Sequence, residues 1–194
     1  MVNWIVLVGV LWGGLAMTAQ GNELKKSKKE AVVLLHGHSR TAKSMKLMAR
    51  HLTDQDYAVF TIDYPSRRES IADLANTELV RELGLRPLES FSRVHVVTHS
   101  MGGLLIRKYL ETHSLPGLGR IVMLSPPSQG SEVVDRWAGS CLYQWWMGPS
   151  GLEMGTDDAA VPSQLPPVTY PVGILTGSRS INWILSMQIP GKDD

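Results

Sequence analysis

The chain has 194 residues, a formal net charge of +1 and 43% hydrophobic residues. That length suits one domain with a substantial core. The near-neutral charge argues against a nucleic-acid partner, because nucleic-acid-binding proteins normally carry a basic patch or stripe. The single cysteine, Cys141, excludes an intramolecular disulfide. No Cys and His residues have the spacing of metal ligands, and we expect neither a metal site nor a cofactor.

The amino-terminal segment 4–17, WIVLVGVLWGGLAM, is an uncharged apolar run. It is shorter than the roughly 20 apolar residues of a membrane-spanning helix. Small residues up to Ala19 follow it, as a signal-peptide cleavage site requires. We expect residues 1–20 to be the signal peptide of an exported protein, either periplasmic or secreted. Because no Lys or Arg precedes the run, an uncleaved membrane anchor is the main alternative, and a buried element of the fold is the other.

Residues 31–194 alternate strand-like and helix-like segments and are expected to form one domain, preceded by a basic linker at 21–30. Helices are predicted at about 43–53, at 69–83 and after Gly102. Continuous apolar runs predict five strands, at 31–37, 57–63, 94–99, 120–127 and 171–177. Buried strands separated by helices predict a mostly parallel α/β sheet covered on both faces. The stretch 128–170 is too long for a plain connection and predicts a cap over a site.

The third predicted strand ends in THSMGG, a pattern typical of the nucleophile elbow, in which a sharp turn joins a strand to a helix. Such a turn lifts the hydroxyl of Ser100 above the carboxyl end of the sheet. Gly102 lets the helix approach the strand, and the N–H of Met101, at the helix start, can stabilise an oxyanion. Thr98 replaces the first glycine of G-x-S-x-G, and its β-branched side chain crowds the turn. A purely structural turn serine is the alternative.

The first predicted strand runs into His36-Gly37-His38. In an elbow-type hydrolase the loop after this strand supplies the second N–H of the oxyanion hole. We expect that N–H from His38, with Gly37 permitting a close approach. The His36 and His38 imidazoles are expected to form hydrogen bonds that shape the loop. His99 and Gly103 are expected to support the elbow.

Four motifs in order, VVLLHGHSRT, IDYPSR, VHVVTHSMGG and MLSPPSQGSEVVDR, resemble bacterial α/β-hydrolases of the esterase and lipase type. The resemblance covers about residue 31 to the end. It implies an α/β-hydrolase fold, with a mostly parallel sheet flanked by helices, a cap insertion and a Ser–acid–His triad in that chain order. It further implies Ser100 as the nucleophile, His38 and Met101 as oxyanion donors, and Asp194 or its neighbour Asp193 as the acid.

The histidine of that family follows one further strand, whereas all six histidines of this chain, at positions 36, 38, 51, 95, 99 and 113, precede the proposed acid. We expect His99 to turn back toward the sheet and His113 to lie too far along the helix to act as the base. The sequence therefore predicts a carboxyl-terminally truncated hydrolase that lacks its last strand and catalytic histidine. The activity of the 194-residue chain itself is then in doubt. Asp63 and Asp135 are alternative acids, each expected to be structural.

The predicted function is hydrolysis of a small-molecule carboxylic ester with an apolar acyl group, through an acyl-enzyme at Ser100. A thioesterase or amidase of the same fold, or a non-catalytic protein of that fold, is the alternative. Five large side chains in the predicted cap are expected to pack on the core, with an acyl pocket or contact with a membrane or lipid surface as alternatives: Trp137, Tyr143, Trp145, Trp146 and Met147. The sequence does not predict an oligomeric state.

Overall fold

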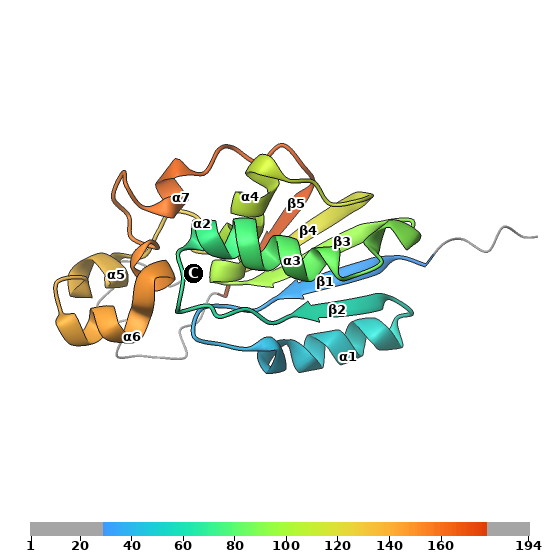
Figure 1. Cartoon of the computed structure of the whole chain (residues 1–194), viewed down its shortest axis with the longest axis horizontal. Helices are drawn as coiled ribbons and strands as arrows, with labels where there is room; N and C mark the ends of the chain where they lie inside the picture. The colour runs from blue at the N-terminus through green and yellow to red at the C-terminus, as the bar shows by residue number, and fades with distance from the viewer. Residues whose placement is uncertain (1–28, 178–194) are drawn as a thin grey trace, which may run out of the picture.

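A single parallel β-sheet organises the computed structural model, which describes residues 29–177. Its strands follow the order β2-β1-β3-β4-β5 (Figure 1). Their bounds are β1 Ala31–Leu35, β2 Ala58–Ile62, β3 Val94–His99, β4 Leu118–Leu124 and β5 Val172–Leu175. All four pairings are parallel, which confirms the predicted fold class. The predicted signal peptide, most of the basic linker and the predicted acid lie outside the described residues.

Helices cover both faces of the sheet, so the interior strand β1 is buried along its whole length. Alternate side chains of a strand point to opposite faces. Val33 and Leu35 belong to the larger apolar cluster, which includes residues of α4 (Met101–Thr112). Val32 and Leu34 instead join Met45 in a smaller cluster, against which residues of α1 (Lys46–Asp54) pack. Burial on two faces explains why β1 reads as one continuous apolar run rather than an alternating one.

The predicted helices are present, with small differences at their ends. The predicted 43–53 helix begins as the 3₁₀ turn η1 (Ala42–Met45) and continues as α1. The 69–83 pattern forms three consecutive helical pieces and is followed by the short η3; these four are α2 Ile71–Asp73, the π-helical η2 Leu74–Leu79, α3 Val80–Gly84 and η3 Leu88–Ser90. The first strand ends at Leu35 instead of residue 37, because His36 and Gly37 already belong to the loop that approaches the site.

The predicted cap, residues 128–170, contains α5 (Glu132–Trp137), α6 (Cys141–Leu152) and α7 (Val161–Gln164). Figure 1 shows α5 and α6 beyond the carboxyl ends of the strands. Helix α6 is kinked at Gly148, which has φ +66° and precedes a proline. A side chain at this position would collide with the carbonyl oxygen of Arg67. The kink therefore lets the cap pack directly against the loop that follows β2.

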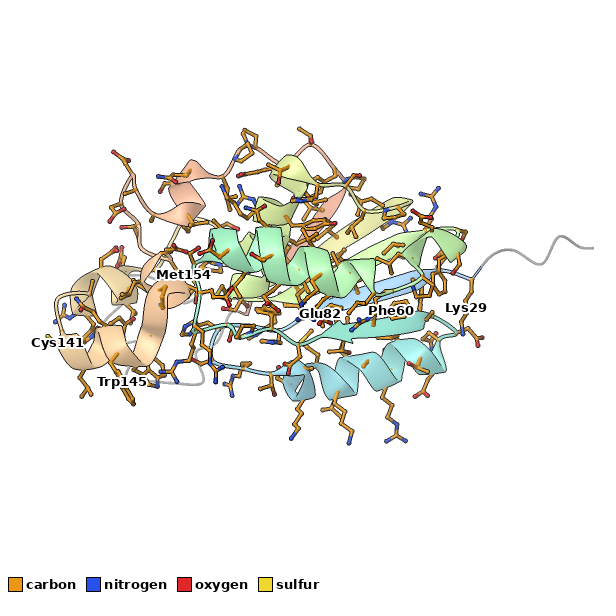
Figure 2. All side chains as sticks on the ribbon, viewed as in Figure 1. Lys29, Phe60, Glu82, Cys141, Trp145 and Met154 are labelled. Atoms are coloured by element: carbon orange, nitrogen blue, oxygen red, sulfur yellow. The ribbon has the colours of Figure 1, made fainter. Side chains whose placement is uncertain are left out.

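The five large side chains of the cap divide: Tyr143 and Met147 pack on the core as expected, whereas the tryptophans remain exposed. Trp145 is 75% exposed and Trp146 is 50% exposed, while Met147 of the same helix is buried. Cys141 at the start of α6 is exposed too. Figure 2 shows Trp145 and Cys141 on the cap, at the end of the molecule opposite Lys29. The spacing of aromatic residues does not reveal which face of a short helix meets the sheet.

Among residues 29–177, β5 forms one edge of the sheet, and its side chains are exposed, with Ile174 at 54% and Leu175 at 62%. The proposal that a last strand is missing concerns the chain beyond β5 and stays a prediction. No helix in the described part of the chain combines the length and apolar character that crossing a membrane requires.

We predict that Gly102→Ala destabilises the fold by roughly 1–3 kcal/mol, because overpacking forces the backbone to shift. A Cβ at Gly102 would lie 2.9 Å from the carbonyl oxygen of His36 and 3.0 Å from that of Leu35. Gly84→Ala is the matched control, since nothing lies within 4 Å of a Cβ there. Urea unfolding measures both variants. Equal stability of the two would contradict the close approach of α4 to β1.

Candidate active site

The turn that joins β3 to α4 holds Ser100 in an uncommon backbone conformation, with φ +50° and ψ −125°. Residues other than glycine rarely adopt a positive φ. Such backbone strain persists only where the surrounding structure enforces it. Two backbone hydrogen bonds do so here. The N–H of Ser100 donates to the carbonyl of Leu124 in β4 at 2.8 Å, and its carbonyl accepts from the N–H of Gly103 at 2.9 Å. The turn therefore has the strand–serine–helix geometry of a nucleophile elbow.

Thr98 occupies the position where the elbow pattern has its first glycine, and its side chain is completely buried. Its hydroxyl has no hydrogen-bond partner among the described residues. The space for the Thr98 side chain is left by Gly103, which has no side chain of its own. A Cβ on Gly103 would lie 3.4 Å from Thr98 Oγ1 and 2.9 Å from the Cβ of Pro126. The crowding expected from a β-branched residue is thus accommodated by the glycine at position 103.

The loop after β1 lies directly against the elbow. A Cβ added to Gly37 would lie 3.1 Å from the Cβ of Ser100 and 2.7 Å from Nδ1 of His99. Any side chain at position 37 would therefore press on the candidate nucleophile. This contact brings the loop that carries His38 beside the first turn of α4, whose opening N–H groups, including that of Met101, lack partners within the helix. The shared oxyanion-hole role of His38 and Met101 stays a prediction.

His36 anchors this loop from inside the protein. Its ring is fully buried, and Nδ1 donates to the carbonyl of Gly37 at 2.9 Å. The ring stacks on Tyr64, with centroids 4.0 Å apart, and the Tyr64 hydroxyl donates to the His36 carbonyl. Burial raises the pKa of Tyr64, which therefore stays a neutral donor. Both rings fix the loop and leave His36 no access to Ser100.

His38 connects the loop to the cap. Its Nε2 donates to the carbonyl of Met147 in α6 at 2.6 Å, and the hydroxyl of Ser39 lies 3.0 Å from its Nδ1. A Cβ on Gly151 would lie 2.8 Å from Nε2, so α6 packs tightly on this imidazole. Because both ring nitrogens are engaged, the His38 side chain positions the cap.

The surroundings of the His36, His38 and His99 imidazoles disfavour the charged form. Burial lowers the pKa of all three, and it is the largest cause in each case. Nearby positive charge acts in the same direction, from Arg67 on His38 and from Arg40 on His99. His99 as a residue keeps solvent exposure, but its Nδ1 lies against the loop after β1, 2.7 Å from where a Cβ on Gly37 would be, so its ring is partly shielded. The expectation that this side chain turns back toward the sheet stays a prediction.

The remaining histidines lie away from the elbow. His51 belongs to α1, His95 lies 3.2 Å from Glu30, and His113 directly follows α4. All six histidines of the chain fall within residues 29–177. None of them is hydrogen-bonded to Ser100. The described residues therefore contain no Ser–His pair.

Two of the candidate acids have structural roles in the described residues. Asp63 accepts a backbone N–H from the start of η1 at 2.8 Å. Asp135 accepts from the N–H and the hydroxyl of Thr156, at 3.0 Å and 2.6 Å, inside the cap. Asp193 and Asp194 lie outside the described residues, and their role stays a prediction. Within residues 29–177, no group of three or more His, Cys, Asp or Glu side chains is arranged to bind a metal ion.

Sequence reasoning missed the residues that fasten the cap to the sheet. Ser150 of α6 donates to the carbonyl of Ser66 at 2.5 Å, and both side chains are buried. Arg67 donates to the carbonyl of Trp145 at 3.2 Å. Glu153 accepts the N–H of Ile71 at 2.7 Å, at the start of α2. The only sequence signal for these contacts was the turn Tyr64-Pro65-Ser66 inside the motif IDYPSR. This turn does not identify its partners in the distant cap.

The comparisons with known proteins agree with this geometry. The model of the alpha/beta hydrolase family matches residues 32–184. The chain therefore belongs to the α/β-hydrolase family, which confirms the resemblance found in the sequence. Comparison with curated proteins gives no match.

Solved structures share the fold at low sequence identity. Phospholipase PlaB from Legionella pneumophila, in complex with thio-NAD, has a TM-score of 0.63 and 22% identity over 78% of this chain and 38% of that one. The mature lipase BlEst2 from Bacillus licheniformis has a TM-score of 0.59 and 18% identity, over 81% and 69%. The N-formylmaleamic acid deformylase from Pseudomonas putida has a TM-score of 0.50 and 16% identity, over 78% and 75%. This chain thus spans less than half the length of the phospholipase.

We predict that the free energy of unfolding falls as the pH drops through about 6.5, the ordinary pKa of histidine. Burial lowers the pKa of His36 in the folded state. The unfolded chain therefore binds more protons in this range, and stability is lost on acidification. His36→Asn should flatten this pH dependence, whereas His51→Asn, which changes an exposed residue of α1, should preserve it. Urea unfolding at several pH values makes the comparison, and identical slopes for all three proteins would contradict the assignment.

Proposed function

We propose that this protein is a serine hydrolase that cleaves carboxylic esters through an acyl-enzyme at Ser100. The observation that carries the proposal is the positive φ of Ser100 at the junction of a buried strand and a helix. A strained turn at this place presents a hydroxyl above the carboxyl end of the sheet. The order of the strands adds to this support. The order of the strands reverses between β1 and β3, because β2 lies on one side of this parallel pair and β4 and β5 lie on the other. Ligands of open α/β sheets bind at such a switch point.

In the proposed reaction, Ser100 Oγ attacks the ester carbonyl, and its proton leaves to a general base. The N–H groups of His38 and Met101 stabilise the oxyanion that forms on the carbonyl oxygen. The C–O bond to the alcohol then breaks, the alcohol departs with the proton, and water hydrolyses the acyl-enzyme. Asp194, or Asp193, is the proposed acid. Since no described histidine is hydrogen-bonded to Ser100, we expect the 194-residue chain to turn over slowly.

An apolar acyl group suits the cap. Trp145 and Trp146 are exposed, and Met147 lies buried between the cap and the His38 loop. The same aromatic surface suits contact with a lipid surface, and export through residues 1–20 would bring the protein to such substrates. The phospholipase and the lipase are named as enzymes of lipid substrates. The deformylase is named for a different substrate class, which keeps amide cleavage as a second candidate.

We predict that a fluorophosphonate probe labels Ser100, slowly, and that Ser100→Ala abolishes the label. Ser100 is only partly buried, so the probe can reach it, but an unassisted serine is scarcely ionised at neutral pH. Ser125→Ala is the matched control. Ser125 directly follows the carboxyl end of the neighbouring strand β4, as Ser100 follows that of β3, and it also has a positive φ, +43°. Tandem mass spectrometry locates the adduct.

Two results would contradict the proposal. Labelling that survives Ser100→Ala would show that another residue is the nucleophile. Complete absence of labelling by the folded chain would favour the alternative of a non-catalytic protein of this fold. Rapid, Ser100-dependent hydrolysis of a p-nitrophenyl ester would instead contradict the expected slow turnover and would require one of the six described histidines to act as base.

A further inference from the structure

A cavity rich in arginine lies beside the candidate active site. Its volume is about 710 Å³. The loop after β1 supplies Arg40, two residues beyond His38, and the loop after β2 supplies Arg67 and Arg68. Arg81 of α3 completes the arginine set, and Trp145 of α6 lines the cavity from the cap. The cavity therefore extends from the loop at the proposed oxyanion hole to the cap.

The positive charge in this cavity is only partly neutralised. Two carboxylates also line it, Glu78 and Asp63. Arg81 is paired twice, with Glu78 at 2.7 Å and with Glu82, which does not line the cavity, at 2.8 Å. Asp63 accepts a backbone N–H at 2.8 Å and lies 3.4 Å from Nε2 of His36. Of the described carboxylates, none lies within ion-pair distance of the three remaining arginines, which are Arg40, Arg67 and Arg68.

Arg67 is held in place without any ligand. It donates to the carbonyl of Trp145 at 3.2 Å, and its guanidinium carbon lies 6.0 Å from the centroid of the Trp145 ring. Its Nε is buried and has no hydrogen-bond partner in the described part of the chain. Gly148 packs on its backbone carbonyl. A guanidinium fixed in this way loses little side-chain freedom when an anion binds.

We propose that this arginine cavity, defined by Arg40, Arg67, Arg68, Arg81 and Trp145, binds the phosphate group of a phosphate-bearing ester substrate. The guanidinium group matches phosphate because its planar fork forms two parallel N–H···O bonds. The inference rests on the proposed function, since it assigns the substrate class of the same site. It adds that the acyl end of the substrate lies at Ser100 while its phosphate lies under Trp145.

Calorimetric titration of the full chain with glycerol 3-phosphate at low salt tests the binding. We expect saturable binding that weakens at least about tenfold in the double variant Arg40→Gln/Arg68→Gln, because two charge-assisted contacts are lost. Both arginines are exposed, and neither side chain forms a hydrogen bond or ion pair among the described residues, which favours a folded variant. Arg50→Gln removes an exposed arginine from α1, outside the cavity, and should bind as the unmodified chain does. Glycerol should not bind.

Four results decide the proposal. Failure of the folded chain to bind glycerol 3-phosphate, or equal affinity of the double variant and Arg50→Gln, would overturn it. Dihexanoylphosphatidylglycerol should bind more tightly than inorganic phosphate. Equal affinity would indicate a site for free phosphate and would contradict the link to a substrate. Ser100→Ala should retain binding, so that a failure of the proposed chemistry stays distinguishable from a failure of the phosphate site.

Discussion

The close approach of the loop after β1 to the turn at Ser100 determines the geometry of the candidate site. Gly37 lies where a Cβ would press on Ser100, and Gly102 lies where a Cβ would press on the backbone of the same loop. The two contacts bring one strand end and one helix start together at the switch point of the sheet. The serine is strained, and its surroundings hold it in that conformation.

The cap depends on the same region. His38 extends from the loop after β1 to the carbonyl of Met147, and Arg67 extends from the loop after β2 to the carbonyl of Trp145. Arg67, one of the residues that fasten the cap, thus also lines the arginine cavity. In the proposed reaction, the Arg67 side chain would therefore both bind the substrate phosphate and hold the cap in place. The exposed tryptophans form the outer surface of this arrangement.

Local patterns predicted the sheet and the elbow, because both follow from contiguous residues. The apolar runs of β1 and β3 indicated buried parallel strands, and the serine followed by two glycines indicated the turn. The stabilising contacts of the cap could not be predicted in this way. Arg40, Arg67 and Arg81 belong to three separate segments, and only the packing of these segments brings them to one cavity. The burial of aromatic residues was predicted wrongly for Trp145, since spacing alone does not show which helix face meets the protein.

A crystal structure of the chain phosphonylated at Ser100 would test the central claim most directly. The phosphonyl oxygen occupies the position of the oxyanion in the acyl-transfer reaction. We predict that the backbone nitrogens of His38 and Met101 both lie about 3 Å from this oxygen, the distance of an oxyanion-hole hydrogen bond. A structure in which the loop 36–41 turns its N–H groups away from the adduct would contradict the assignment of this site.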